Sequence, residues 1–207
     1  MFSGRELYQY FPSCVWTHDL ADFKDMNTRL VQELQALRAR DTGSLSERGA
    51  WQSDCNLHAL EPFQPLTRSF VAASQGVLEF LKYSYTHFEI TDCWANVNRR
   101  GESHSLHSHP NNFLSGVYYV RAPENCGNIV FSDPRPQASV LIPHVTERNP
   151  YNSFKHSIKP KEGRLLMFHS WFQHLVEANQ SEEERISISF NVLLRGRIGY
   201  SSGGAEL

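Results

Sequence analysis

The spacing of apolar residues changes near residue 86, and this change limits the possible folds more than any other feature of the sequence. Before it, two segments have apolar residues at helical spacing: one begins at an Asp19 cap and stops at Thr42-Gly43, and the other runs from Pro65 to Tyr85. After it come short strand-like runs separated by turns with Pro, Gly or Asn, namely FEITDCWANVN, FLSGVYYV, NIVFSDP, ASVLIP, FKHSIKP, GRLLMFHS, HLVEA and RISISFNVLL. Because no helical pattern separates these runs, a βαβ fold is excluded. We therefore predict an all-β jelly-roll core with N-terminal helices packed on one outer face.

The length of the chain fits a single domain. With 207 residues, 40% of them hydrophobic, the chain can bury one sizeable core. We expect one domain over residues 1–207, with a mainly helical part at 1–86 and the jelly-roll core at 87–195. The stretch 42–61 is expected to be a loop, and the tail from residue 200 to 207 is expected to be frayed.

Charge and cysteine usage exclude several classes of function. The formal net charge is −2 and the lysines and arginines form no dense stripe, so we expect no nucleic-acid patch. The four cysteines lie far apart without a CxxC pair, as expected for reduced thiols. The N-terminus does not resemble a secretory leader and no stretch approaches the length of a membrane span. These features predict a cytoplasmic protein without membrane contact.

Three histidines are spaced as metal ligands. His107 and His109 lie two residues apart in HSLHSHP, and Pro110 disfavours helix there, so on an extended segment the two imidazoles share a face. A mononuclear site needs a third ligand, and His174 in SWFQHLVEANQ is the best later candidate. An iron(II) ion held by three protein groups keeps three open positions, which suits the binding of a chelating cosubstrate and of dioxygen.

The second ligand of the pair has alternatives. Asp133 or Glu102 would supply a carboxylate in place of His109, and His104 lies just before the pair. Spacing favours His109, since Asp133 precedes a proline in a predicted turn and there suits a capping role better.

The second half of the chain resembles a known superfamily. The stretch from about residue 88 to 194 is similar to the double-stranded β-helix core of the 2-oxoglutarate/Fe(II)-dependent oxygenases, whose motif is HxD/E…H followed about ten residues later by a basic residue. More narrowly, HSHP…LSGVYYV…FSDPR…SWFQH.VEANQS…RISISFN resembles a group of bacterial and phage 2OG-Fe(II) oxygenases. The resemblance implies a cupin-like jelly roll and an enzyme that hydroxylates its substrate with Fe(II) and 2-oxoglutarate as cofactor and cosubstrate.

Carried over by position, the resemblance assigns roles to several residues. His107 is then the first metal ligand and His174 the distal one, and Arg185 holds the distal carboxylate of 2-oxoglutarate with help from Ser187, in an RxS pattern. A guanidinium binds carboxylate through parallel hydrogen bonds, and Ser187 shares the strand face of Arg185. A further bond to the cosubstrate is expected from one of two core-strand residues, Tyr118 or Asn96. No catalytic residue is expected beyond the metal ligands.

One departure from the family motif keeps other functions open. His109 stands where the family has a carboxylate, so the site is one unit more positive. A three-histidine, cupin-type metal dioxygenase without 2-oxoglutarate is therefore an alternative, and a non-catalytic jelly-roll binding module is another. The substrate, a small molecule or a protein, and assembly as a homodimer are not decided by the sequence.

Overall fold

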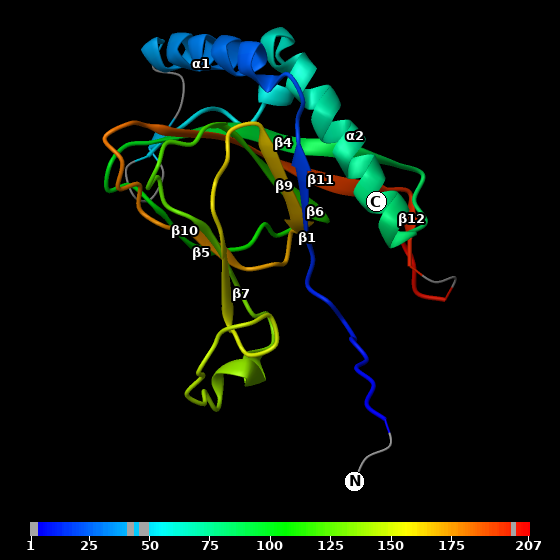
Figure 1. The fold of residues 1–207 in the computed structure, drawn as a ribbon. Coiled ribbons are helices and arrows are strands. Elements are labelled where there is room, and N and C mark those ends of the chain that lie inside the picture. Colours follow the sequence, from blue (N-terminus) through cyan, green and yellow to red (C-terminus); the bar gives the residue numbers. More distant parts are fainter. Residues whose placement is uncertain (1–3, 41–43, 46–49, 200–201) are drawn as a thin grey trace.

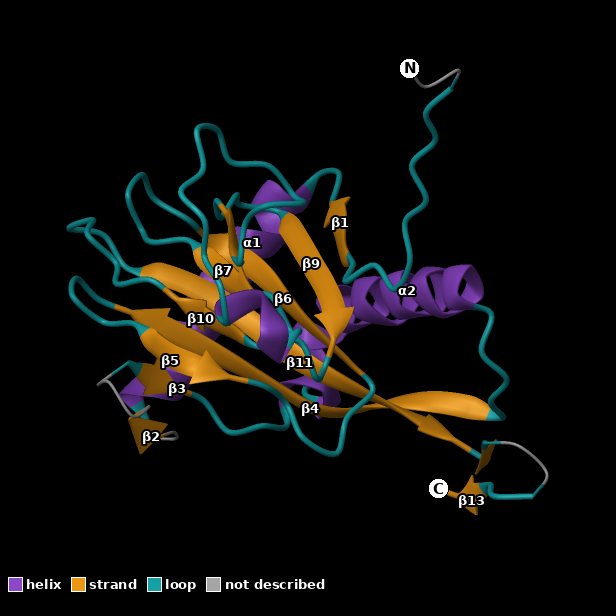
Figure 2. Ribbon diagram, turned by 90° about the horizontal axis from the view of Figure 1, so that it is seen from below, coloured by secondary structure: helices purple, strands orange, loops and turns teal. Residues whose placement is uncertain are grey.

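Two antiparallel β-sheets lie face to face and form the core of the fold (Figures 1 and 2). The computed structural model describes residues 4–40, 44–45, 50–199 and 202–207. The major sheet contains, in spatial order, β1 (Val15–Asp19), β9 (Arg164–His169), β6 (Leu114–Arg121), β11 (Arg185–Arg195), β4 (His87–Asn98), β3 (Trp51–Gln52) and β2 (Ser44–Leu45). The minor sheet contains β5 (His104–His107), β10 (His174–Val176), β7 (Ile129–Ser132) and β8 (Lys155–Ile158). This architecture confirms the predicted jelly roll.

Two helices cover the outer face of the major sheet, as predicted (Figure 1). They are α1 (Phe23–Ala39) and α2 (Gln64–Leu81), and the single-turn helices η1 (Leu57–Ala59) and η2 (Glu61–Phe63) precede α2. The ring of Phe70 on α2 stacks on Phe190 of β11, with centroids 4.0 Å apart. Gly116 on β6 leaves room for this stack, because a Cβ atom there would lie 2.4 Å from the Phe190 ring. The apolar face of α2 therefore closes the outer half of the core.

The strand β6 is buried on both faces, and its alternation separates two cores. Tyr118 faces the helices, where its hydroxyl donates to Asn27 Oδ1 of α1 at 2.7 Å. Tyr119 faces the minor sheet and packs in a second cluster with Phe131 and Phe168. The inner face of the major sheet, which carries Tyr119, is therefore the face from which a site between the two sheets is built.

The prediction that ASVLIP (residues 138–143) forms a strand is wrong. Residues Pro136–Ser139 form the short helix η3, and the chain then continues without regular structure up to β8 in a projecting excursion (Figure 1). Val140 and Leu141 are 83% and 80% exposed, so no neighbouring strand covers this aliphatic run. A short apolar run forms a strand only where another strand at a sheet edge is available to pair with it.

Both ends of the chain also differ from expectation. Asp19 was predicted to cap the first helix, but it ends the unpredicted strand β1, where its carboxylate pairs with Arg164 and Lys161. The tail predicted to fray contains β13 (Ala205–Glu206), which pairs with β12 (Arg197–Ile198). The helix stop at Thr42-Gly43 and part of the loop predicted at 42–61 lie outside the described residues. Over the described ranges, none of the helices is both long and apolar enough to span a bilayer.

Candidate metal centre

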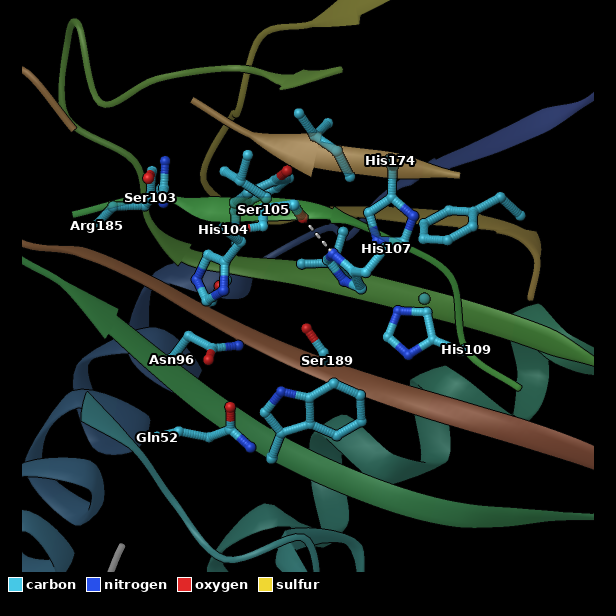
Figure 3. Close-up of a pocket in the computed structure, with 18 of the residues that line it drawn as sticks. Gln52, Asn96, Ser103, His104, Ser105, His107, His109, His174, Arg185 and Ser189 are labelled. Carbon is cyan, nitrogen blue, oxygen red and sulfur yellow. Dashed lines mark hydrogen bonds between the residues drawn. The ribbon is translucent and has the colours of Figure 1, made fainter. Parts of the chain in front are cut away.

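Three histidine side chains converge between the two sheets (Figure 3). His107 ends β5 and His174 begins β10, and the two residues are directly opposite each other in the antiparallel pairing. His109 follows β5 by two residues, and its ring lies 5.3 Å from that of His174 and 5.1 Å from that of His107. One nitrogen from each of the three imidazoles lies within 4.8 Å of the others. Three nitrogen donors at this separation can share one metal ion.

Backbone carbonyl groups orient two of these imidazoles. The Nδ1 atom of His107 lies 2.7 Å from the carbonyl oxygen of Ser105, and that of His174 lies 2.9 Å from the carbonyl oxygen of Phe172. A carbonyl only accepts, so each Nδ1 carries the proton and donates. The Nε2 atom of each ring is then the one with a free lone pair, which is the arrangement usual for metal-bound histidines.

Burial lowers the pKa values of three histidines that line the site. It lowers the pKa of His174 to about 3, with help from the neighbouring His107. It also lowers the pKa values of His109 and His104 to about 4. At neutral pH these rings are therefore neutral, with one nitrogen protonated and the other free, so a metal ion does not have to displace a proton from the free nitrogen.

A polar network fixes the loop that carries His109. The backbone N–H of His109 donates to the carbonyl oxygen of Ser170 at 2.9 Å, and the hydroxyl of Ser170 lies 2.9 Å from that of Ser115. Ser115 donates in turn to Asn191 Oδ1 at 2.8 Å, and Asn191 Nδ2 lies 3.4 Å from Asp92 Oδ2. The position of His109 is thus set by three strands of the major sheet, although His109 lies outside any strand.

The alternative ligands do not join this group. Asp133 pairs with Arg135, Oδ2 to Nη2 at 2.6 Å, in the turn after β7. Glu102 accepts the backbone N–H of Arg99 at 2.7 Å. His104 shares a cavity with the other histidines, but its Nε2 atom lies 3.2 Å from the side chain of Asn98. Among the described residues, the group with ligand geometry is therefore the three histidines, without a carboxylate.

The three histidines line a cavity of about 530 Å³, a size typical of small-molecule sites. Figure 3 shows Arg185 at one end of the cavity and His109 and His174 at the other. Other residues that line the cavity include Gln52, Trp94, Asn96, Ser105, Ser187 and Ser189. The cavity therefore joins the candidate metal centre to a buried cation.

Arg185 is buried with one nitrogen unpaired. It is 1% exposed, and burial lowers its pKa. Its Nη1 atom donates to the carbonyl oxygens of Cys126 and, at 3.2 Å, Glu177. Its Nη2 atom has no partner among the described residues. A buried, unpaired guanidinium nitrogen in a cavity is arranged for an acceptor that comes from outside the chain, and a carboxylate is the best match.

The residues predicted to assist Arg185 divide into two groups. Ser187 and Asn96 line the cavity, on β11 and β4. Tyr118 does not, because it faces the helices and binds Asn27, so its predicted contact with a cosubstrate is corrected. The tyrosine that lines the cavity is its neighbour Tyr119. Tyr118 and Tyr119 alternate along β6, so only one of them can face the cavity, and the sequence alone does not decide which one.

Two other cavity residues were not singled out from the sequence. Gln52 lies in the stretch predicted as a loop and reaches the cavity because β3 pairs with β4. Trp94 lies on β4, and its ring is 5.8 Å from that of His109. Trp94 shares a strand face with Asn96, so the alternation of β4 could have indicated its position.

Comparisons with known proteins agree with the fold. Residues 92–191 match the family described as "Putative 2OG-Fe(II) oxygenase". No curated protein matches the chain. Among solved structures, a Pseudomonas putida prolyl-4-hydroxylase is similar with a TM-score of 0.65 and 16% identity, over 89% of this chain and 94% of that chain.

Two further structures are similar over most of their length. The α-ketoglutarate-dependent epimerase SnoN from nogalamycin biosynthesis has a TM-score of 0.66 and 13% identity, over 94% of this chain and 86% of that chain. HygX from Streptomyces hygroscopicus, solved with nickel and 2-oxoglutarate bound, has a TM-score of 0.61 and 10% identity, over 88% and 83%. At these identities the likeness is one of fold.

Proposed function

We propose that the chain is a 2-oxoglutarate/Fe(II)-dependent oxygenase in which His107, His109 and His174 hold the iron while Arg185 binds the cosubstrate. The observation that carries the assignment is the unpaired Nη2 atom of Arg185, which is buried in the cavity that the three histidines line. The reaction is the hydroxylation of a substrate by dioxygen, coupled to the conversion of 2-oxoglutarate to succinate and carbon dioxide.

The histidines suit an iron(II) ion. They are neutral nitrogen donors, and backbone carbonyl groups already fix two of them in the tautomer that leaves Nε2 free. Three protein ligands leave the side of the metal that faces the cavity open to small molecules. Bound iron and 2-oxoglutarate would activate dioxygen, which is the oxidant, while the chain itself binds and orients the reactants and excludes water.

The other end of the cavity suits the distal carboxylate of 2-oxoglutarate. Arg185 Nη2 offers one charge-assisted hydrogen bond, and Ser187 lies two residues along the same strand on the same face, with its side chain in the cavity. Tyr119 lines the same region and replaces Tyr118 as the tyrosine available to the cosubstrate. Asn96, also in the cavity, is available as a further hydrogen-bonding partner.

One observation favours a second candidate function. His109 replaces the carboxylate of the family's triad, and a three-histidine site also suits a cupin-type dioxygenase whose substrate alone binds the metal. Such an enzyme does not need a buried guanidinium with an unpaired nitrogen in the same cavity. Arg185 therefore supports the 2-oxoglutarate-dependent reaction over this alternative.

The test is an anaerobic titration of the Fe(II)-loaded protein with 2-oxoglutarate, followed by the visible absorption of an iron-bound 2-oxo acid. We expect saturation at one equivalent. Pyruvate is the matched control, because it has the same 2-oxo acid end but no distal carboxylate for Arg185. Equal affinity for both acids, or no binding of 2-oxoglutarate, would instead support the three-histidine dioxygenase.

A further inference from the structure

The cavity has no acidic side chain among the described residues that line it. Its permanently charged lining residue is Arg185, and the others carry imidazole, amide, hydroxyl, aromatic or aliphatic groups or no side chain. A histidine binds a metal ion as a neutral ring, so the three histidines add no charge to the loaded site. The protein therefore offers this space a positive charge and no negative one.

The loaded site has an excess of positive charge. A divalent metal and the Arg185 guanidinium bring three positive charges, and 2-oxoglutarate brings two negative ones. In a site with two histidines and one carboxylate, the protein would supply the missing negative charge. Here His109 takes that place, and a metal-bound imidazole is neutral, so one positive charge remains uncompensated in the cavity.

Two acidic groups near the cavity offset this charge only in part. Asp92 is close enough to His109 to act on its pKa, against the larger effect of burial, and Glu102 acts similarly on Arg185. Both carboxylates are half-buried and already accept hydrogen bonds, Asp92 from Thr91 at 3.2 Å and Glu102 from a backbone N–H. Neither lines the cavity, so a small molecule inside it still meets a net positive field.

We infer that the substrate of this oxygenase is a small anion whose charged group binds in the cavity and supplies the negative charge that the ligand set lacks. This inference rests on the proposed function. A carboxylate is the chemical group that fits best, because hydroxyl and amide donors of Ser103, Ser189 and Gln52 also line the cavity and oxygen anions accept from such donors.

A second observation adds to the description of the substrate. Asn96 is 5% exposed, and its Oδ1 atom has no hydrogen-bond partner among the described residues. A buried acceptor of this kind is matched by an N–H or O–H group. Because 2-oxoglutarate carries no such donor at neutral pH, the substrate is expected to carry one. The substrate class is therefore an acid with a hydroxyl or N–H group, with Trp94 beside the site as an apolar wall.

The test uses acetate as the probe on protein loaded with Co(II) and saturated with 2-oxoglutarate, with binding measured by calorimetry and by the visible spectrum of the metal. Acetamide is the neutral control of the same shape. We expect saturable binding of acetate and at least tenfold weaker binding of acetamide. Two variants add a negative charge. Ser189→Asp places it on the major-sheet wall of the cavity, and His109→Asp places it at the proposed metal site.

Each charged variant has a neutral counterpart, Ser189→Asn and His109→Asn. We expect both Asp variants to weaken acetate binding at least tenfold, and Ser189→Asn to change it less than about threefold. Equal binding of acetate and acetamide, or a Ser189→Asp variant that binds acetate as the native protein does, would overturn the inference. A 2-oxoglutarate titration of the same samples distinguishes the proposed function from the inferred substrate class. If the protein does not bind 2-oxoglutarate, the proposed function itself is rejected.

Discussion

Replacement of Arg185 should weaken 2-oxoglutarate binding, and the number of guanidinium nitrogens free to bind the cosubstrate sets the size of this loss. A complete bidentate pair is worth about 2–5 kcal/mol on truncation of one partner. Here Nη1 is already used by backbone carbonyl groups and Nη2 is the nitrogen without a partner, so one charge-assisted bond is available rather than two. Such a bond contributes about 1.5–3 kcal/mol. For Arg185→Met we therefore expect a loss of about 2–3 kcal/mol, or about 30- to 150-fold in affinity.

The assay is the anaerobic titration of the Fe(II)-loaded variant, with iron stoichiometry measured first. Arg185→Lys keeps the charge but not the direction of Nη2, so it should bind 2-oxoglutarate less tightly than the native protein and more tightly than Arg185→Met. Ser187→Ala should cost about 0.5–1.5 kcal/mol. Thermal unfolding controls for the loss of the Nη1 bonds to the carbonyl groups. A folded Arg185→Met variant that binds iron and has native affinity for 2-oxoglutarate would refute the assignment.

Three further results are expected. Tyr119→Phe should weaken 2-oxoglutarate binding, whereas Tyr118→Phe should leave it unchanged and lower the unfolding free energy by about 1 kcal/mol, which denaturant titration measures; an effect of Tyr118→Phe on 2-oxoglutarate binding would contradict the assigned faces. Metal analysis should show that His109→Ala loses much of the iron and that His109→Asp retains it, so full retention by His109→Ala would mean that His109 is not a ligand. Burial lowers the pKa values of His104, His109 and His174 to between about 3 and 4, below the unfolded value near 6.5. The unfolded chain then binds more protons, so the metal-free protein should lose stability as the pH falls from about 6.5 to about 4, and a flat profile from chemical denaturation would contradict this.

The strand pattern and the spacing of the histidines could be predicted because both are local. The alternating residues of β4 and β11 defined these strands, and the HxH spacing with one distant histidine identified three rings that the structure brings together. The position of Arg185 also follows from a local pattern. It begins β11, a strand of the major sheet, and the alternating residues Arg185, Ser187 and Ser189 all line the cavity.

The remaining features depend on contacts between distant segments. The choice between Tyr118 and Tyr119 depends on which face of β6 the helices cover, and both residues have the same neighbours in sequence. Gln52 reaches the cavity only through the pairing of β3 with β4. The run Val140–Ile142 has the composition of a strand but projects from the core, because pairing partners are a property of the whole fold.

Because His107 and His174 pair directly, iron bound by the proposed ligands would stabilise the minor sheet. β5 and β10 are four and three residues long, so few backbone hydrogen bonds hold them together. A bound ion ties these short strands to each other and to the loop of His109, whereas the major sheet has long strands and a helical cover of its own. We expect amide hydrogens of the minor sheet to exchange faster, and proteases to cut there first, when iron is removed. Iron supply would then set the lifetime of the protein in addition to its activity.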